Sequence, residues 1–277
     1  MIAFKRAREL FEMKAGRSDY ALRLDYNELP YNPPQIGKEI DYNHYPEEEN
    51  TDLINIIARF YRLPQSEIAV THGVDEALDR FIQLFPNNSF VLFTPTFHGF
   101  TERLNVNESN TRHYTLSPDF RIAPSDISNL TKNDVVIIAS PNNPTGHLFT
   151  EEEITQLLEA AHTVLVDETY IDFSSSKGWL AKRPDRMFIY RSFSKSFGLA
   201  GLRAGFLVGP SSEMESIRGK QWFCHMSSPV ISMINHALSS KWRYGVIKEV
   251  IQERERVIQE LQRMRFDVRP TETNFII

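Results

Sequence analysis

The chain has 277 residues, 41% of them hydrophobic and 12% aromatic, which predicts one large domain with a sizeable buried core and a smaller additional piece. Its formal net charge of -5 is mild and no basic stripe is present, which argues against a nucleic-acid-binding protein. The single cysteine, Cys224, excludes an internal disulfide, and no charged-then-apolar leader opens the chain, so we expect a cytoplasmic protein.

In chain order, the stretch RLDYNELPYNPPQIG is rich in Pro and Asn and predicts an irregular N-terminal segment. From about Ser66 to Gly209, short apolar runs alternate with amphipathic stretches. The expected strands are EIAV, SFVLFTP, DVVIIAS, TVLVDE, MFIYRS and AGFLVG, and the expected helices include GVDEALDRFIQLF and TEEEITQLLEAA. Because strands this apolar are covered on both faces, the pattern predicts an α/β fold with a mostly parallel sheet flanked by helices. None of these runs approaches the roughly 20 residues that cross a bilayer, so no membrane association is expected.

Beyond Gly209, the stretch INHALSSKWRYGVIKEVIQERERVIQELQRM has apolar residues at helical spacing and predicts one long surface or connecting helix. The final residues, RPTETNFII, form an apolar run that predicts a strand. We therefore divide the chain into an N-terminal segment that joins a small domain (1–40), a large α/β domain (41–240), and a linking helix that begins an incomplete C-terminal small domain (241–277).

Polar residues follow several of the predicted strands. Lys195 lies between two serines after MFIYR, Asp167 ends HTVLVD, SPNNPTG follows DVVIIA, and HGVDEAL follows EIAV. Because α/β sheets bind ligands beyond the carboxyl ends of their strands, we expect these groups to share one rim. From spacing alone, an exposed lysine on a polar turn remains as good an interpretation of Lys195.

Three ordered motifs, SPNNPTG, VDETYIDF and SFSKSFGLAGLRAG, resemble those of the fold type I pyridoxal phosphate enzymes. The chain is most similar to the histidinol-phosphate aminotransferase branch of the class I/II aminotransferases, from RLDYNELPYNP to TETNFII. The resemblance implies pyridoxal 5'-phosphate as cofactor, a small-molecule amino donor, a 2-oxo acid acceptor and a homodimer.

The resemblance also assigns the two catalytic residues. Lys195 would bind the cofactor aldehyde covalently and, once released, act as the general base for the substrate α-proton. Asp167 would face the pyridine nitrogen and keep it protonated, so that the ring accepts electrons. Outside the resemblance, Asp167 would be an ordinary helix-capping or turn aspartate.

Further residues match the family's cofactor contacts. Those assigned to the phosphate, through backbone N–H groups at a helix start or through side chains, are Gly73, Val74, Asp75, Ser192, Ser194 and Arg203. Phe97 matches the aromatic that stacks on the pyridine, and Asn143 and Tyr170 match the residues that bond its phenolic oxygen. Tyr45 matches the tyrosine that reaches the neighbouring subunit's phosphate. Each of these residues also has an ordinary interpretation. Gly73 would be a turn glycine, Arg203 part of a surface ion pair, Phe97 a core residue and Tyr45 a surface tyrosine.

Two other kinds of site are not expected. The spacing of FGLAGLRAG departs from the dinucleotide pattern G-x-G-x-x-G. The histidines show no H-x-x-x-H pairing, so we predict no metal site and interpret His72, His98 and His225 as structural.

The resemblance implies several tens of further residues after NF, including an arginine that binds the substrate α-carboxylate, whereas this sequence ends at Ile277. A truncated active enzyme, a shortened enzyme that uses another arginine such as Arg23 or Arg269, and a protein that binds the cofactor without turnover all remain open. We favour the aminotransferase, acting on an amino acid or an amino-alcohol phosphate similar to histidinol phosphate. A decarboxylase of phosphorylated amino acids, similar to threonine-phosphate decarboxylase, is the alternative enzyme.

Overall fold

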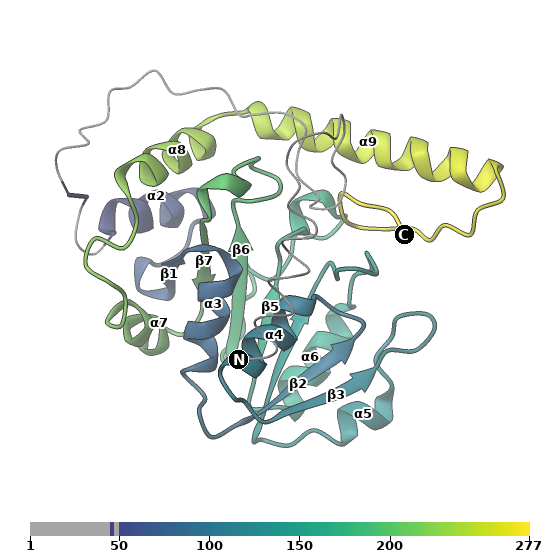
Figure 1. Cartoon of the computed structure of the whole chain (residues 1–277), viewed down its shortest axis with the longest axis horizontal. Coiled ribbons are helices and arrows are strands. Elements are labelled where there is room, and N and C mark those ends of the chain that lie inside the picture. Colours follow the sequence, from purple (N-terminus) through teal and green to yellow (C-terminus); the bar gives the residue numbers. More distant parts are fainter. Residues whose placement is uncertain (1–44, 47–49) are drawn as a thin grey trace.

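The computed structural model describes residues 45–46 and 50–277, and a seven-stranded sheet lies at its centre (Figure 1). In spatial order the strands are β1 (Ile68–Thr71), β7 (Gly205–Val208), β6 (Met187–Ser192), β5 (Thr163–Asp167), β4 (Asp134–Ala139), β2 (Ser89–Thr94) and β3 (Thr111–Thr115). Strand β7 is antiparallel to β1 and β6, and all other neighbouring pairs are parallel. The predicted mostly parallel sheet is therefore confirmed.

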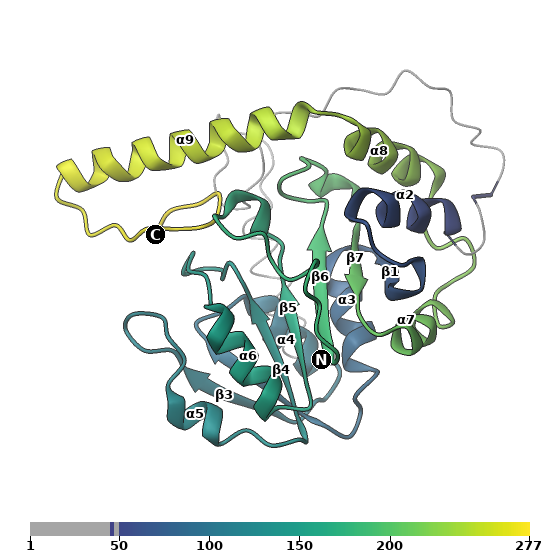
Figure 2. The ribbon, with the colours of Figure 1, turned by 180° about the vertical axis from the view of Figure 1, so that it is seen from behind.

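Helices cover both faces of the sheet (Figures 1 and 2). The helices packed on one face are α3 (Gly73–Ile82), α4 (His98–Val106) and α7 (Ser211–Arg218). Those on the other face are α2 (Thr51–Tyr61), α6 (Glu151–Ala160) and α8 (Ser228–Ser239), with the short α5 (Pro124–Ser128) beside α6. Alternate residues of β4 enter the two cores, Val135 and Ile137 one of them and Val136 and Ile138 the other. This burial on both faces explains why the strands are continuously apolar.

The predicted single long helix is two helices, which corrects the sequence interpretation. Helix α8 ends at Ser239 and α9 (Trp242–Arg263) begins three residues later. Ser240 has an extended backbone, and its Oγ accepts a hydrogen bond from the backbone N–H of Trp242 at 3.1 Å. A serine side chain that bonds a nearby N–H competes with continuous helix, so it favours a break at this point.

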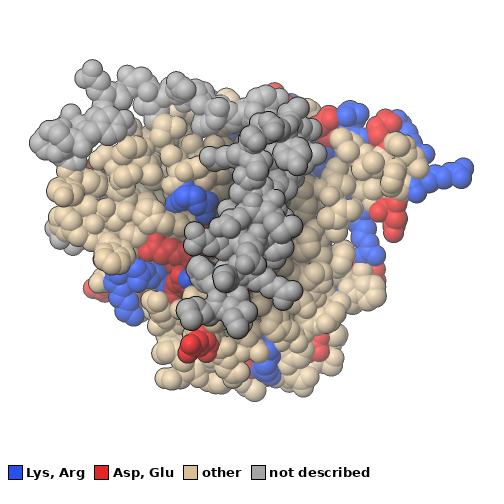
Figure 3. All heavy atoms as spheres, viewed as in Figure 1, with Lys and Arg blue, Asp and Glu red and all other residues tan. Residues whose placement is uncertain are grey.

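Helix α9 extends from the sheet domain and carries charges of both signs toward its far end (Figure 3). Arg256 and Arg263 pair with glutamates three residues earlier, at N–O distances of 2.6 and 2.5 Å. Within the described residues, no helix combines the length and apolar character needed to span a membrane.

The predicted C-terminal strand is wrong. Residues 266–277 contain neither helix nor strand, and the segment instead packs against the loop after β4. The backbone N–H of Glu272 donates to the Gly146 carbonyl at 2.7 Å, and Arg254 of α9 donates to the Thr273 carbonyl at 2.8 Å. The predicted N-terminal stretch lies outside the described residues, and the three domain boundaries remain a prediction.

Candidate active site

The ends of neighbouring strands are in register at one edge of the sheet. Ala139, Asp167 and Tyr190 are paired across β4, β5 and β6, and Thr71, Gly205 and Ser192 are paired across β1, β7 and β6. The loops that follow β1, β4, β5 and β6 therefore start from the same edge, as the sequence predicted. The short 3-10 turns η2 (Ile171–Phe173) and η3 (Ala200–Leu202) lie in two of the connections at this edge, and η1 (Gln65–Glu67) precedes β1.

Asp167 ends β5 with its side chain buried. Burial raises the pKa of this carboxyl to about 6, although hydrogen bonds from Thr169 and the nearby Lys195 act in the opposite direction. The Thr169 hydroxyl and backbone N–H both donate to Oδ1, at 2.6 and 2.9 Å. A carboxylate in this setting is stabilised by any cationic group that binds beside it.

Lys195 lies in a tight loop after β6 and is only partly exposed. Its carbonyl accepts a hydrogen bond from Gly198 N–H at 3.0 Å, and Ser194 N–H donates to Ser192 Oγ at 3.0 Å. Its Nζ lies 5.8 Å from the centre of the Tyr170 ring, within the range of a cation–π contact. Lys195 is therefore not a surface lysine on a polar turn.

The loop after β4 places Asn143 near Tyr170, which follows β5. Their Nδ2 and Oη atoms are 3.5 Å apart, and the tyrosine is buried with its ring edge-on to Phe275. Asn142, which the sequence analysis did not single out, is buried and holds the loop through bonds to Thr96, Pro95 and Thr145 at 2.7–2.9 Å.

The residues expected to bind phosphate form an open, polar corner. Gly73 begins α3 with a φ of 72°, and a Cβ there would lie 2.7 Å from Nη2 of Arg203. The guanidinium of Arg203 is also 3.6 Å from Asp75, and both side chains are about half exposed. A helix N-terminus beside a guanidinium attracts anions. Ser192 ends β6, Ser194 follows it in the lysine loop, and Val74 is in the first turn of α3.

The two predicted aromatic contacts, Phe97 and Tyr45, differ in exposure. Phe97 precedes α4, is half-buried, and packs so closely over Gly99 that a Cβ there would lie 2.4 Å from its ring. Tyr45 is 83% exposed, and its described ring contact is with Phe223, at 6.0 Å between centroids. The structure therefore does not bring Tyr45 to the residues around Lys195 of its own chain, and its role stays a prediction.

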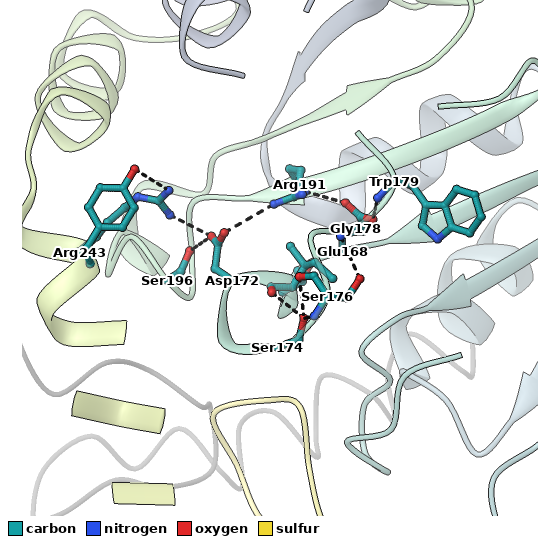
Figure 4. Close-up of polar contacts among 12 residues, drawn as sticks. Glu168, Asp172, Ser174, Ser176, Gly178, Trp179, Arg191, Ser196 and Arg243 are labelled. Atoms are coloured by element: carbon teal, nitrogen blue, oxygen red, sulfur yellow. Dashed lines mark hydrogen bonds and ion pairs between the residues drawn. The ribbon is translucent and has the colours of Figure 1, made fainter. Parts of the chain in front are cut away.

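A buried charge network lies next to the lysine loop, and the sequence analysis did not foresee it (Figure 4). Arg191 Nε donates to Glu168 Oε2 at 2.8 Å, and both side chains are almost fully buried. Burial opposes the charge on Arg191, but Glu168, Tyr61 and Asp172 raise its pKa overall. Asp172 lies between two arginines, 3.7 Å from Arg191 and 3.1 Å from Arg243 of α9.

Ser196, the residue after Lys195, donates its hydroxyl to the same Asp172 oxygen that Arg243 contacts. Asp172 thus joins η2, the lysine loop and the first turn of α9 (Figure 4). The sequence held a signal for this network, because the charged Arg191 lies near the end of an otherwise apolar strand.

The arginines considered for the substrate carboxylate are placed differently. Arg269 donates to the Pro118 carbonyl at 2.5 Å, and its guanidinium lies 4.8 Å above the Phe120 ring. These contacts hold its guanidinium in the loop after β3. Arg23 lies outside the described residues.

The family described as aminotransferase class I and II matches residues 22–277. The histidinol-phosphate aminotransferase of Thermococcus gammatolerans is 32% identical over 274 residues, covering 94% of this chain and 78% of that protein. A Burkholderia pseudomallei candidate aminotransferase of known structure is 30% identical, with a TM-score of 0.81 over 91% of this chain and 80% of its own. A histidinol-phosphate aminotransferase from Sinorhizobium meliloti, solved with pyridoxal-5'-phosphate, shares the fold at a TM-score of 0.73 and 20% identity, over 85% of this chain and 68% of that one.

Proposed function

This chain belongs to the class I and II aminotransferases, and from that membership we propose that it transfers an amino group from histidinol phosphate, or a similar amino-alcohol phosphate or amino acid, to a 2-oxo acid. It is a pyridoxal phosphate-dependent transaminase, which uses an amino donor and a 2-oxo acid acceptor. The observation that carries the proposal is the partly buried Lys195 beside the buried Asp167, at the ends of adjacent strands.

The residues at this edge fit pyridoxal phosphate. The fit rests on the buried acid with a raised pKa, on the half-buried Phe97 ring, and on the corner in which Gly73 leaves no room for a side chain beside Arg203. These three features match a ring nitrogen that carries a proton, an aromatic face and a phosphate. When bound, the cofactor supplies an aldehyde that takes up the amino group and a ring that withdraws electrons.

The chain's own groups would hold and move protons around that ring. Lys195 would bind the aldehyde and, when released, carry the substrate α-proton through its neutral amine. Asp167 would hold a proton on the ring nitrogen, and Asn143 and Tyr170 would bond the phenolic oxygen. The phosphate would lie against the start of α3, near Ser192, Ser194 and Arg203.

The proposal also includes a cytoplasmic homodimer in which Tyr45 serves the partner's phosphate. The exposed side chains of Tyr45, Trp222 and Phe223 support an interface, because aromatic residues are enriched where proteins associate.

A panel of amino donors tests the proposed reaction. The cofactor-loaded protein is mixed with histidinol phosphate, histidinol, phosphothreonine and common amino acids, and the cofactor absorbance, keto product and carbon dioxide are measured. We expect a spectral change and a keto product with histidinol phosphate, and a weaker response with histidinol, which lacks the phosphate. Carbon dioxide without keto product would replace the proposal with a decarboxylase. No spectral response to any donor would indicate cofactor binding without turnover.

A further inference from the structure

Three potential metal ligands meet where β1 joins α3, although they come from two distant segments. They are His72 before the helix, Glu76 in its first turn, and His225, which is 153 residues from His72 in the chain. Each offers one ligand atom, and these atoms lie within 4.8 Å of one another. The sequence predicted no metal site because its histidines show no short spacing such as H-x-x-x-H, and these three residues come together only in the fold.

The contact between His225 and Glu76 has unusual geometry for a hydrogen bond. Nε2 of His225 lies 2.9 Å from Oε2 of Glu76, yet within the described part of the chain it makes no hydrogen bond with good alignment. Two ligands of a tetrahedral ion, each about 2.1 Å from it, lie about 3.4 Å apart, so these two atoms would need to separate by only about 0.5 Å to share an ion. The His225 side chain is 2% exposed, so this buried nitrogen points into the cluster and not to solvent.

His72 supplies the second imidazole and lies on the solvent-exposed side of the cluster. Its Nε2 lies 2.9 Å from the backbone carbonyl of His225, so it acts as the donor and Nδ1 keeps the lone pair. Metal-bound histidines commonly donate their other ring N–H to a backbone carbonyl in this way. Because His72 is exposed, an ion and its water ligands can reach the cluster from solvent.

Both carboxylate oxygens of Glu76 have neighbours, and Oε2 is the one that faces the two histidines. Arg80 Nε approaches Oε1 at 3.4 Å, whereas Oε2 faces His225 and accepts the His72 backbone N–H at 2.8 Å. Burial acts to raise the pKa of Glu76, but the nearby His225 and His72 outweigh it and lower the pKa overall. The positive N-terminus of α3 opposes a cation, and the ionised carboxylate offsets that opposition.

We propose that His72, Glu76 and His225 form a binding site for a divalent metal ion of the zinc class. Two imidazoles and a carboxylate are the ligand types that zinc, cobalt and nickel accept, and water completes the coordination. The site does not depend on the proposed roles of Lys195 and Asp167.

Cobalt binding to the intact protein tests the site. Cofactor-loaded protein is stripped of metals with a chelator, exchanged into clean buffer and titrated with Co²⁺, and the visible ligand-field bands are followed. We expect one Co²⁺ per chain, displaced by one equivalent of Zn²⁺. Lack of saturable binding of either ion would overturn the proposal.

Variants then locate the ion. His72→Ala alters an exposed side chain, so the fold should persist, and we expect the affinity to fall by more than about 100-fold, because even outer-shell partners cost 10–100-fold. Glu76→Gln should also lose the ion. His113→Ala, an exposed histidine of β3, and Cys224→Ser, beside His225, are matched controls that should bind normally. Binding that survives both His72→Ala and Glu76→Gln would show that the three residues form only a hydrogen-bonded cluster.

Discussion

Asp167 is a charged residue in a place that disfavours charge. It is buried at the end of β5, and its two described hydrogen bonds both involve Oδ1. Burial therefore outweighs the contacts that favour ionisation, and the pKa is raised from 3.8 to about 6. At neutral pH the carboxylate is ionised, and a protonated ring nitrogen beside it would lower the free energy of the bound state.

Replacing Asp167 with Asn should stabilise the cofactor-free protein in a pH-dependent way. The pKa of Asp167 is higher in the folded protein than in the unfolded one. The wild-type protein is therefore most stable, relative to higher pH, below about pH 4, where the acid is protonated, and it loses this stability as the pH rises to about 6. Above pH 6 the buried charge costs about 3 kcal/mol, which Asn avoids while still accepting from Thr169. Urea unfolding at pH 4 and pH 8 measures the difference. If Asp167→Asn and wild type differ in unfolding free energy by the same amount at both pH values, this account is contradicted.

Lys195 must be able to lose its proton, so Lys195→Arg should nearly abolish turnover. Arginine keeps the charge but remains protonated, and loss of a general base lowers kcat by about 10²- to 10⁴-fold. Steady-state kinetics gives kcat, and borohydride reduction followed by mass spectrometry shows whether the cofactor is attached. The exposed Lys177→Arg is the matched control and should behave as wild type. Substantial activity in Lys195→Arg would refute the assignment.

At the scale of elements, Asp172 connects three segments: η2, the lysine loop and α9. We expect Asp172→Asn to lower the unfolding free energy by about 3 kcal/mol, because two arginines lose their common anion. Ser196→Ala removes one neutral donor and should cost about 1 kcal/mol.

Asp172 should also act as a positioning residue for Lys195. In Asp172→Asn we expect the pH midpoint of the cofactor's visible absorbance to move, because the lysine loop loses its anchor. Glu253→Gln, on the exposed face of α9, should leave that midpoint unchanged. Destabilisation of Asp172→Asn with an unmoved midpoint would show that the network is structural only.

The elements that the sequence predicted are those with one dominant signal. Six strands were predicted because burial on both faces makes them continuously apolar, and β3 was missed because TRHYT lies half-exposed at the sheet edge. The C-terminal segment was predicted wrongly because Phe275 packs on Tyr170, and the backbone of Glu272 bonds the loop after β4, so the apolar run joins no sheet. Lys195 and Asp167 were found from motifs, whereas Arg243 was not, since its partner Asp172 is 71 residues away and the contact has no local pattern.

At the scale of the whole molecule, a shared active site predicts complementation between inactive variants. Tyr45→Ala and Lys195→Ala each damage a different half of the same site. If Tyr45 serves the partner's phosphate, a mixed dimer contains one site with both residues intact, and should recover about half of the wild-type activity. Co-expression with two affinity tags isolates the mixed dimer for assay, and sedimentation reports its mass. A mixed dimer no more active than its parents would contradict the shared site.

Strand β7 runs against its neighbours, and this reversal constrains the segment that carries Lys195. The segment leaves the sheet at Ser192 and re-enters beside it at Gly205, so both ends are fastened to adjoining strands. Two backbone hydrogen bonds also cross the segment, from Phe193 N–H to the Ala204 carbonyl and from Leu199 N–H to the Phe193 carbonyl, both at 3.1 Å. The main chain on either side of Lys195 is therefore tied to its own return path, which restrains where the amine can lie when a substrate enters.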